Sequence, residues 1–255
     1  MSLDRQLLLR RFDEQVRRGL SAEPGFRVEH TSRVVRVIGL WNCVLYAALD
    51  ADSVDDEIRA QQDYFQRIGG KLEWKVYGHD QPSDLPQRLA RAGFEAGGEE
   101  TLMVFELGDD LPHVALPPDI SLRRVANREG LDDVNAVAHL AFGIDFSALN
   151  AEFAARLPLG TLCFYVAYSD TDPVAAARLE LPPGSDFAGL YGGGTAPAYR
   201  HRGIYRCLVA ARANEARSRG YRYLNVEAEP SSRPILDRLG FVALTSVRAW
   251  EWTPP

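Results

Sequence analysis

The feature that most constrains the fold of this chain is a short pattern that occurs once in each half. The segment G-K-L-E-W-K-V at 70–76 is similar to G-Y-R-Y-L-N-V at 220–226, and L-A-R-A-G-F at 89–94 is similar to L-D-R-L-G-F at 236–241. In each half, a strand pattern is followed by a short helix, a Gly-Phe pair and another strand. Because order and spacing agree, we expect that one structural unit has been duplicated.

Hydrophobic periodicity predicts helices and strands in both halves. Strands are expected at 26–39, 42–49, 71–77, 100–107, 119–124, 161–168, 174–182, 187–196, 221–228 and 241–252. Helices are expected at 3–20, 53–68 with Ser53 as N-cap, 84–92, 128–141, 147–156, after Gly203, and at 232–239. This mixture predicts an α+β (mixed α/β) fold in which helices cover sheets.

The segment 108–118 is rich in proline and acidic residues, and it is the predicted domain boundary. We therefore expect two domains, residues 1–112 and residues 118–255. A chain of 255 residues is long enough for two domains of ordinary size.

Composition excludes several classes of protein. A formal net charge of −6 argues against general nucleic-acid binding, which favours a basic domain. The three cysteines, Cys43, Cys163 and Cys207, are far apart, so neither a disulfide framework nor a metal site is predicted, and a reducing compartment fits. No apolar run has the length of a signal peptide core or a membrane span. We expect a cytoplasmic protein without metal, membrane or nucleic-acid partner; nothing in the sequence indicates an oligomeric state.

Positive charge is concentrated where it is electrostatically unfavourable. Arg200, His201 and Arg202 directly precede Gly203, and a helical run comes after that glycine. Cations at a helix N-terminus oppose the helix dipole, which favours anions there. Either these side chains are solvated, or an anion binds at this position. Free backbone amides, a glycine and two arginines together suit a pyrophosphate.

These residues, with the segments C-terminal to them, resemble the GNAT superfamily of acyl-CoA-dependent N-acyltransferases. The similar segments are T-A-P-A-Y-R-H-R-G-I-Y-R-C-L, E-A-R-S-R-G-Y-R-Y-L-N-V and S-R-P-I-L-D-R-L-G-F, which cover most of 186–245 in the family's order. The family signature Gln/Arg-x-x-Gly-x-Gly/Ala reads here from Arg200 to Tyr205, and Tyr205 replaces its last, small residue. The resemblance implies two GNAT-like domains, each a twisted mixed sheet flanked by helices.

The resemblance also implies a coenzyme A site. The loop Arg200, His201, Arg202, Gly203, Ile204 and Tyr205 is expected to bind the pyrophosphate of acetyl-CoA. The backbone of Thr195 and Ala196 is expected to bind the pantetheine arm, and Ser232 either caps the next helix or contacts the cofactor. Tyr205 fits if its ring points into the core.

The family's usual catalytic side chains are absent. Its base positions correspond to Gly189 and Tyr191, and its acid position to Leu236. Glu227 is a candidate substitute base, although a surface carboxylate in a salt bridge is the favoured explanation of this residue; Tyr191 is a second candidate, or it binds substrate or packs. The roles are filled from elsewhere, the amine needs no strong base, or the domain no longer catalyses.

The N-terminal copy has no Arg-x-x-Gly at the equivalent position. Its segment 48–59 carries Asp50, Asp52, Asp55 and Asp56, which would repel a pyrophosphate. We therefore predict a degenerate copy and one active site, in residues 119–255.

The substrate cleft is expected between the helices at 128–156 and the C-terminal strands. Carboxylates there (Asp145, Glu152 and Glu180) favour a cationic amine, and rings there (Phe142, Phe146 and Phe153) allow an apolar one. The leading hypothesis is an N-acetyltransferase that acetylates a primary amine of a small molecule or peptide. The alternative is a non-catalytic acyl-CoA sensor or partner-binding module.

Overall fold

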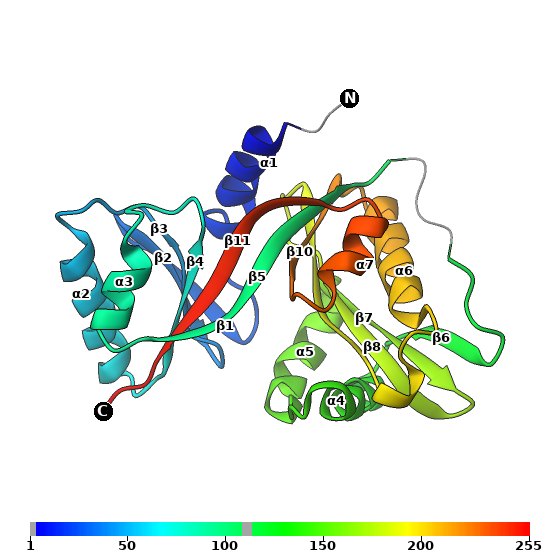
Figure 1. Ribbon diagram of the computed structural model, residues 1–255. Helices are drawn as coiled ribbons and strands as arrows, with labels where there is room; N and C mark the ends of the chain where they lie inside the picture. The colour runs from blue at the N-terminus through cyan, green and yellow to red at the C-terminus, as the bar shows by residue number, and fades with distance from the viewer. Residues whose placement is uncertain (1–3, 109–113) are drawn as a thin grey trace. The chain divides into compact units, whose positions relative to one another are not determined.

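The computed structural model describes residues 4–108 and 114–255 (Figure 1). The described strands are β1 (Phe26–His30), β2 (Val34–Gly39), β3 (Cys43–Ala47), β4 (Leu72–Tyr77), β5 (Glu95–Glu106), β6 (Ile120–Arg124), β7 (Leu162–Ser169), β8 (Asp172–Glu180), β9 (Phe187–Thr195), β10 (Tyr223–Ala228) and β11 (Val242–Trp252). The α-helices are α1 (Arg5–Phe12), α2 (Val54–Arg67), α3 (Leu85–Arg91), α4 (Arg128–Phe142), α5 (Asn150–Arg156), α6 (Ile204–Ser218) and α7 (Arg233–Arg238). The predicted mixed α/β class is confirmed.

The chain divides into two compact units that are not contiguous in sequence. The first unit contains the described residues up to Met103 together with Glu227–Pro234 and Ala243–Pro255. The second contains the described residues of Val104–Val226 together with Ile235–Val242. The C-terminal residues belong to the first unit because β11 pairs antiparallel with β4, with Val247 opposite Tyr77 and Trp252 opposite Leu72.

This division differs from the predicted one along the chain. The predicted limits, 1–112 and 118–255, stay a prediction, and 109–113 within the expected boundary lie outside the described residues. Strands β5, β10 and β11 each begin in one unit and end in the other. A division of the chain at one sequence position assigns each of these strands to a single domain, because the sequence pattern does not show which strands pair.

In the first unit, β1, β2 and β3 form an antiparallel meander, and β3 runs parallel to β4. The predicted single strand at 26–39 is wrong, because it is a hairpin. The Thr31 hydroxyl accepts hydrogen bonds from the amides of Arg33 (3.2 Å) and Val34 (2.9 Å), and this local turn breaks the strand. Helices α2 and α3 contribute Ile58, Phe65 and Leu89 to a core that also contains the buried Trp74.

Two predicted helices of the first unit differ in detail. The helix expected at 3–20 consists of α1, capped by Asp4, and a π-helical segment, η1 (Asp13–Arg17); residue 3 lies outside the described residues. Ser53 precedes α2, as predicted, but its hydroxyl donates to Asp50 (2.7 Å) and makes no cap hydrogen bond to the helix.

The second unit is a sheet with the strand order β10-β9-β8-β7-β6. Strands β6 to β9 are antiparallel neighbours, and β9 runs parallel to β10. A Cβ placed on Gly194 would meet the ring of Phe142 of α4, whereas one placed on Gly193 would meet Tyr205 of α6. Because neighbouring residues of a strand face opposite sides, α4 and α6 cover opposite faces of this sheet.

The described part of the chain has no helix that is long and apolar enough to cross a membrane. Within residues 4–108 and 114–255, no group of three or more His, Cys, Asp or Glu side chains is placed to hold a metal ion.

A buried ion pair stabilises the first unit and supplies a test of its packing. The fully buried Arg17 guanidinium donates two hydrogen bonds of 2.8 Å to Asp80 and one of 3.1 Å to the Leu45 carbonyl. We expect Asp80→Asn to lower the free energy of unfolding by about 3 kcal/mol, since it leaves the fully buried Arg17 charge with the partly exposed Asp13 as its acidic partner. Urea denaturation measures the change. The control Asp56→Asn removes the partner of the exposed Arg59 and should lower the free energy of unfolding by less than about 0.5 kcal/mol. Equal losses of stability in Asp80→Asn and Asp56→Asn would contradict a stabilising role for the buried ion pair.

Candidate coenzyme A site

The candidate site lies where the pairing between the parallel strands β9 and β10 ends. Strand β9 pairs with β10 at three positions, Phe187 with Tyr223, Ala188 with Leu224 and Gly189 with Asn225. In the register of the described residues, the remainder of β9, Leu190–Thr195, has no partner on β10. This segment leads directly into the loop that carries the signature.

The loop after β9 leads to the start of α6 and leaves the backbone at that start uncovered. A short 3-10 turn, η4 (Pro197–Tyr199), is followed by His201 with φ 62° and Gly203 with φ 82°. Nothing lies within 4 Å of a Cβ placed on Gly203, and no side chain caps the helix. The first turn of α6 contains no acidic residue. The start of this helix therefore offers backbone amides and partial positive charge to an anion.

Within the protein, the two arginines of the loop are already engaged. Arg200 donates from Nε to the Thr195 carbonyl (3.1 Å) and from Nη2 to the Ala141 carbonyl (3.1 Å). Arg202 pairs with Asp119, its Nη2 lying 2.5 Å from Oδ1, and this hydrogen bond lowers the pKa of the Asp119 carboxyl. His201 is exposed. The arginines thus hold the loop against β9, α4 and the start of β6.

Tyr205, which departs from the signature, is accommodated by a glycine. A Cβ at Gly193 would lie 2.9 Å from Cε2 of Tyr205, so the ring packs directly against β9. The ring points toward the sheet, as required if a large residue is to fit at this position.

The predicted pantetheine contacts are partly occupied by the protein itself. The Ala196 amide donates to Val174 (2.8 Å), and the Ala196 carbonyl accepts from the Tyr199 amide (2.9 Å). A ligand at Ala196 would have to use the second lone pair of that carbonyl. At Thr195 the carbonyl already accepts from Arg200, and the hydroxyl oxygen is buried without a hydrogen-bond partner among the described residues.

Tyr191 lies on β9 opposite Arg178 of β8. Its ring folds over Gly189, and the Arg178 guanidinium lies 5.2 Å from the ring centroid. The structure thus gives Tyr191 packing contacts beside the free segment of β9. Gly189, which corresponds to a base position of the family, has no room for a side chain, since a Cβ there would overlap this ring.

Glu227 and Ser232 both lie in Glu227–Pro234, which belongs to the first unit. The Glu227 carboxylate forms an ion pair with Lys75 and accepts a hydrogen bond from the Tyr77 hydroxyl. Burial raises the pKa of Glu227, but Lys75 and Tyr77 outweigh it, and the pKa is lowered. A lowered pKa makes a weaker base, so the contacts favour the salt-bridge interpretation. The hydroxyl and amide of Ser232 both donate to the Glu229 carbonyl, at 3.2 and 3.0 Å.

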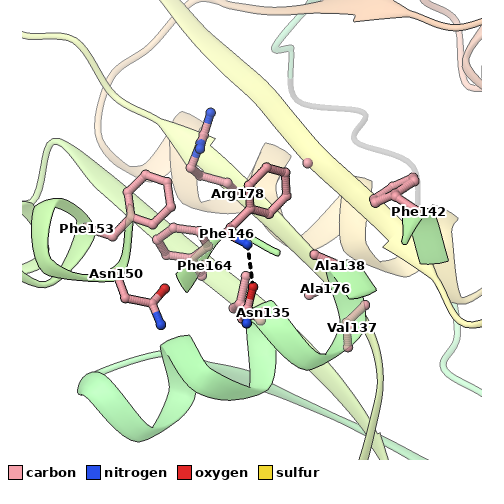
Figure 2. A pocket seen from close by; sticks show the side chains of 12 residues that line it. Asn135, Val137, Ala138, Phe142, Phe146, Asn150, Phe153, Phe164, Ala176 and Arg178 are labelled. Atoms are coloured by element: carbon pink, nitrogen blue, oxygen red, sulfur yellow. Dashed lines mark hydrogen bonds between the residues drawn. The ribbon is translucent and has the colours of Figure 1, made fainter. Parts of the chain in front are cut away.

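A pocket in the second unit lies between α4, α5 and strands β7 to β9 (Figure 2). Its lining is mostly apolar, with Asn135, Asn150 and Arg178 as polar residues. The residues that line it are Val134, Asn135, Val137, Ala138, Phe142, Phe146, Asn150, Phe153, Phe164, Ala176, Arg178 and Gly192. Asn135 accepts a hydrogen bond from the Phe146 amide (2.6 Å), which fixes the loop after α4.

This pocket contains the three rings expected in the cleft, but two of the three expected carboxylates are paired with arginines, and the third, Asp145, is exposed. Glu180 pairs with Arg156 (2.7 Å) and Arg178 (3.0 Å), and Glu152 lies 3.5 Å from Arg156. Asp145 accepts from the Ser147 amide (2.8 Å). Sequence reasoning missed Arg178 and the two asparagines, because neither spacing nor motif distinguishes them from surface residues.

Comparison with known proteins agrees with this geometry. Residues 135–241 match the model of the Acetyltransferase (GNAT) family. The chain is similar to the structure of a GCN5-related N-acetyltransferase from Kribbella flavida, at 16% identity and a TM-score of 0.72, covering 100% of this chain and 97% of that chain. It is also similar to a tandem GNAT protein from the clavulanic acid biosynthesis pathway, at 14% identity and a TM-score of 0.62, covering 92% and 86%.

A third similar structure is a GCN5-related N-acetyltransferase from Sphaerobacter thermophilus, at 14% identity and a TM-score of 0.60, covering 97% of this chain and 84% of that chain. No curated protein matches the chain. The chain therefore has the GNAT acetyltransferase fold, as its motifs predicted. That the N-terminal copy is degenerate stays a prediction.

The ion pair of Glu227 gives a pH-dependent prediction. Because the folded-state pKa is lowered, the contribution of Glu227 to stability is present above its unfolded pKa, near 4.5, and is lost as pH falls through the folded value. We expect Glu227→Gln to lower the free energy of unfolding by about 3 kcal/mol at pH 7, since Lys75 loses its buried partner. The difference from wild type should shrink as pH falls below about 4.5.

Urea denaturation between pH 7 and pH 3 measures this difference. Glu99→Gln is the control, because Glu99 pairs with Arg248 at an exposed position. A Glu227→Gln protein as stable as wild type at pH 7 would contradict the structural role of this ion pair.

Proposed function

We propose that this protein transfers an acetyl group from acetyl-CoA to a primary amine of a small molecule or peptide. The observation that carries the proposal is the uncapped start of α6 at Gly203, reached directly from the segment of β9 that has no partner on β10. An extended acyl-pantetheine can lie along that segment while the pyrophosphate accepts from the amides of the helix. The match of 135–241 to the acetyltransferase family model supports it.

Cofactor binding is assigned to the loop Arg200–Tyr205, with Thr195, Ala196 and Ser232 as further candidates. In this proposal the amides of Gly203, Ile204 and Tyr205 supply most of the attraction, since Arg200 and Arg202 already have partners. The arginines add positive charge and hold the loop in the conformation that exposes those amides. An open position at Gly203 lets phosphate oxygens approach the backbone closely.

The acetyl transfer itself needs a neutral amine as nucleophile. The amine attacks the thioester carbonyl, a C–N bond forms, the C–S bond breaks, and the proton lost by the amine balances the departing thiolate. Tyr191 is the candidate within the second unit for a hydrogen bond to the reacting groups. Glu227 stays a candidate base, although its lowered pKa weakens it.

One observation favours the alternative, a non-catalytic acyl-CoA sensor. The family's base and acid positions are occupied by Gly189, covered by the Tyr191 ring, and by the fully buried Leu236. Neither position can exchange a proton. Binding without turnover would identify this alternative.

Three buried free cysteines support the proposed cytoplasmic, reducing environment, because none of them is paired in the described part of the chain.

Titration calorimetry with acetyl-CoA tests the cofactor site. We expect Gly203→Glu to weaken binding at least tenfold, about 1.4 kcal/mol, because it places a carboxylate where the pyrophosphate accepts from the amides. The matched control is Gly184→Glu: Gly184 has φ 75° and open space around its Cβ position, so it reproduces the backbone strain at a turn far from the loop in sequence. Arg200→Ala should also weaken binding, by releasing the loop.

If Gly203→Glu, Gly184→Glu and Arg200→Ala all bind acetyl-CoA with the same affinity, the assignment of the loop Arg200–Tyr205 to cofactor binding is overturned. If wild type binds acetyl-CoA, a panel of amines followed by mass spectrometry distinguishes enzyme from sensor. Acetylation of any amine in the panel identifies an enzyme. Tight binding of acetyl-CoA without release of free coenzyme A in the presence of any amine favours the sensor.

A further inference from the structure

The strongest unexplained feature of the second unit is a buried arginine that has no acidic partner among the described residues. Arg212 lies on the face of α6 that covers the sheet, and 1% of its surface is exposed. Its Nε donates to the Leu208 carbonyl and its Nη1 to the Arg178 carbonyl, each at 3.0 Å. Nη2 is buried and has no hydrogen-bond partner. Burial lowers the pKa of Arg212 to about 10.

This arrangement is costly if stability is its only purpose. Replacing buried charged groups by apolar residues of similar volume is often neutral or stabilising. What an apolar residue cannot do is donate hydrogen bonds to a backbone carbonyl in a sheet. The position of that carbonyl therefore shows what Arg212 contributes.

The Arg178 carbonyl adjoins an irregularity in the pairing of β8 with β9. Ala176 lies opposite Gly194 and Arg178 opposite Tyr191, so Ala177 faces two residues of β9, Gly192 and Gly193. This is a β-bulge, and Gly192 within it has a positive φ of 55°, which glycine adopts without strain. A bulge interrupts the ladder and leaves backbone groups without their usual partners. Arg212 donates to the carbonyl of Arg178, the β8 residue directly after the irregularity.

Arg212 also meets the bulged strand directly. A Cβ on Gly193 would lie 3.6 Å from Nη2 of Arg212 and 2.9 Å from the ring of Tyr205. Gly193 is thus the position at which β9 packs against α6. A bulge bends its strand and increases the local twist, and here it lies within the segment Leu190–Thr195 that has no partner on β10.

We propose that Arg212 is a positioning residue, which holds the bulge of β9 from the α6 side and so fixes the backbone of Leu190–Thr195 for the acyl-pantetheine arm. The ligand part of this inference rests on the coenzyme A site proposed above. The residue acts through β9 and does not itself contact the reacting atoms.

The test compares two ligands that share the nucleotide. Acetyl-CoA contains the pantetheine arm, whereas adenosine 3′,5′-bisphosphate lacks it. In Arg212→Met, which keeps an unbranched though shorter side chain without its donors, we expect acetyl-CoA to bind at least tenfold more weakly by calorimetry. The bisphosphate should bind within twofold of its wild-type affinity, and Arg212→Lys should recover part of the acetyl-CoA affinity. A general loss of structure would weaken both ligands alike.

The matched control is Arg217→Met on the same helix. Arg217 also donates to a backbone carbonyl, that of Gly108 (3.3 Å), but from an exposed position. Its acetyl-CoA affinity should stay within twofold of wild type. Unchanged acetyl-CoA affinity in folded Arg212→Met, or an equal loss for both ligands, would overturn the proposal. If Arg212→Met does not fold by circular dichroism, the same comparison in Arg212→Gln, which keeps a polar side chain without the guanidinium, decides.

Hydrogen–deuterium exchange separates this proposal from the function on which it rests. Without any ligand, amides of 190–195 should exchange at least tenfold faster in the Arg212 variants than in wild type, while those of β7 stay unchanged. Wild-type protein that binds neither ligand refutes the coenzyme A site, yet faster exchange would still support the positioning role. Exchange at 190–195 equal to wild type refutes that role whatever the protein binds.

Discussion

The hydrogen-bond ladder between β9 and β10 ends at Gly189 and Asn225, and the candidate site is built on the part of β9 beyond that end. Beyond that end β9 is paired along one edge only, with β8, so contacts on its two faces add support, and glycines provide the room for them. The Tyr191 ring folds over Gly189, the Tyr205 ring packs against Gly193, and Phe142 packs against Gly194. Each glycine allows one aromatic ring to reach the backbone, so the strand is held by rings on both faces while one edge stays free for a ligand.

The charges at the start of α6 have a structural role of their own. Arg200 joins the loop to the end of β9 and to the last turn of α4, and Arg202 joins it to Asp119. The carbonyls near the end of a helix attract cations, which explains why Arg200 is bound at Ala141. Repulsion between these cations and the start of α6 is reduced because each is bound to oxygen elsewhere. The amides of the helix are thereby left for an anion.

The sequence predicted the class of fold and the position of nearly every element of the second unit, because strand alternation, the Arg-x-x-Gly motif and the Gly-Phe pair are local signals. It missed the hairpin at Thr31, since a side-chain-to-backbone turn has no strong signature. Pairing between distant segments was also beyond it: β11 joins β4, and Glu227 meets Lys75. Arg212 and the bulge opposite Ala177 depend on the register of two strands, which composition does not determine.

The pocket beside β9 bears on how the proposed reaction can proceed without a strong base. Its nearby carboxylates, Glu152 and Glu180, are compensated by arginines, so little negative charge remains to hold an ammonium group. Its walls include four phenylalanine rings. Burial in such surroundings disfavours the charged form of an amine and lowers its pKa. An amine bound there would lose its proton to water more readily than in solution. The apolar walls of the pocket therefore reduce the need for a base.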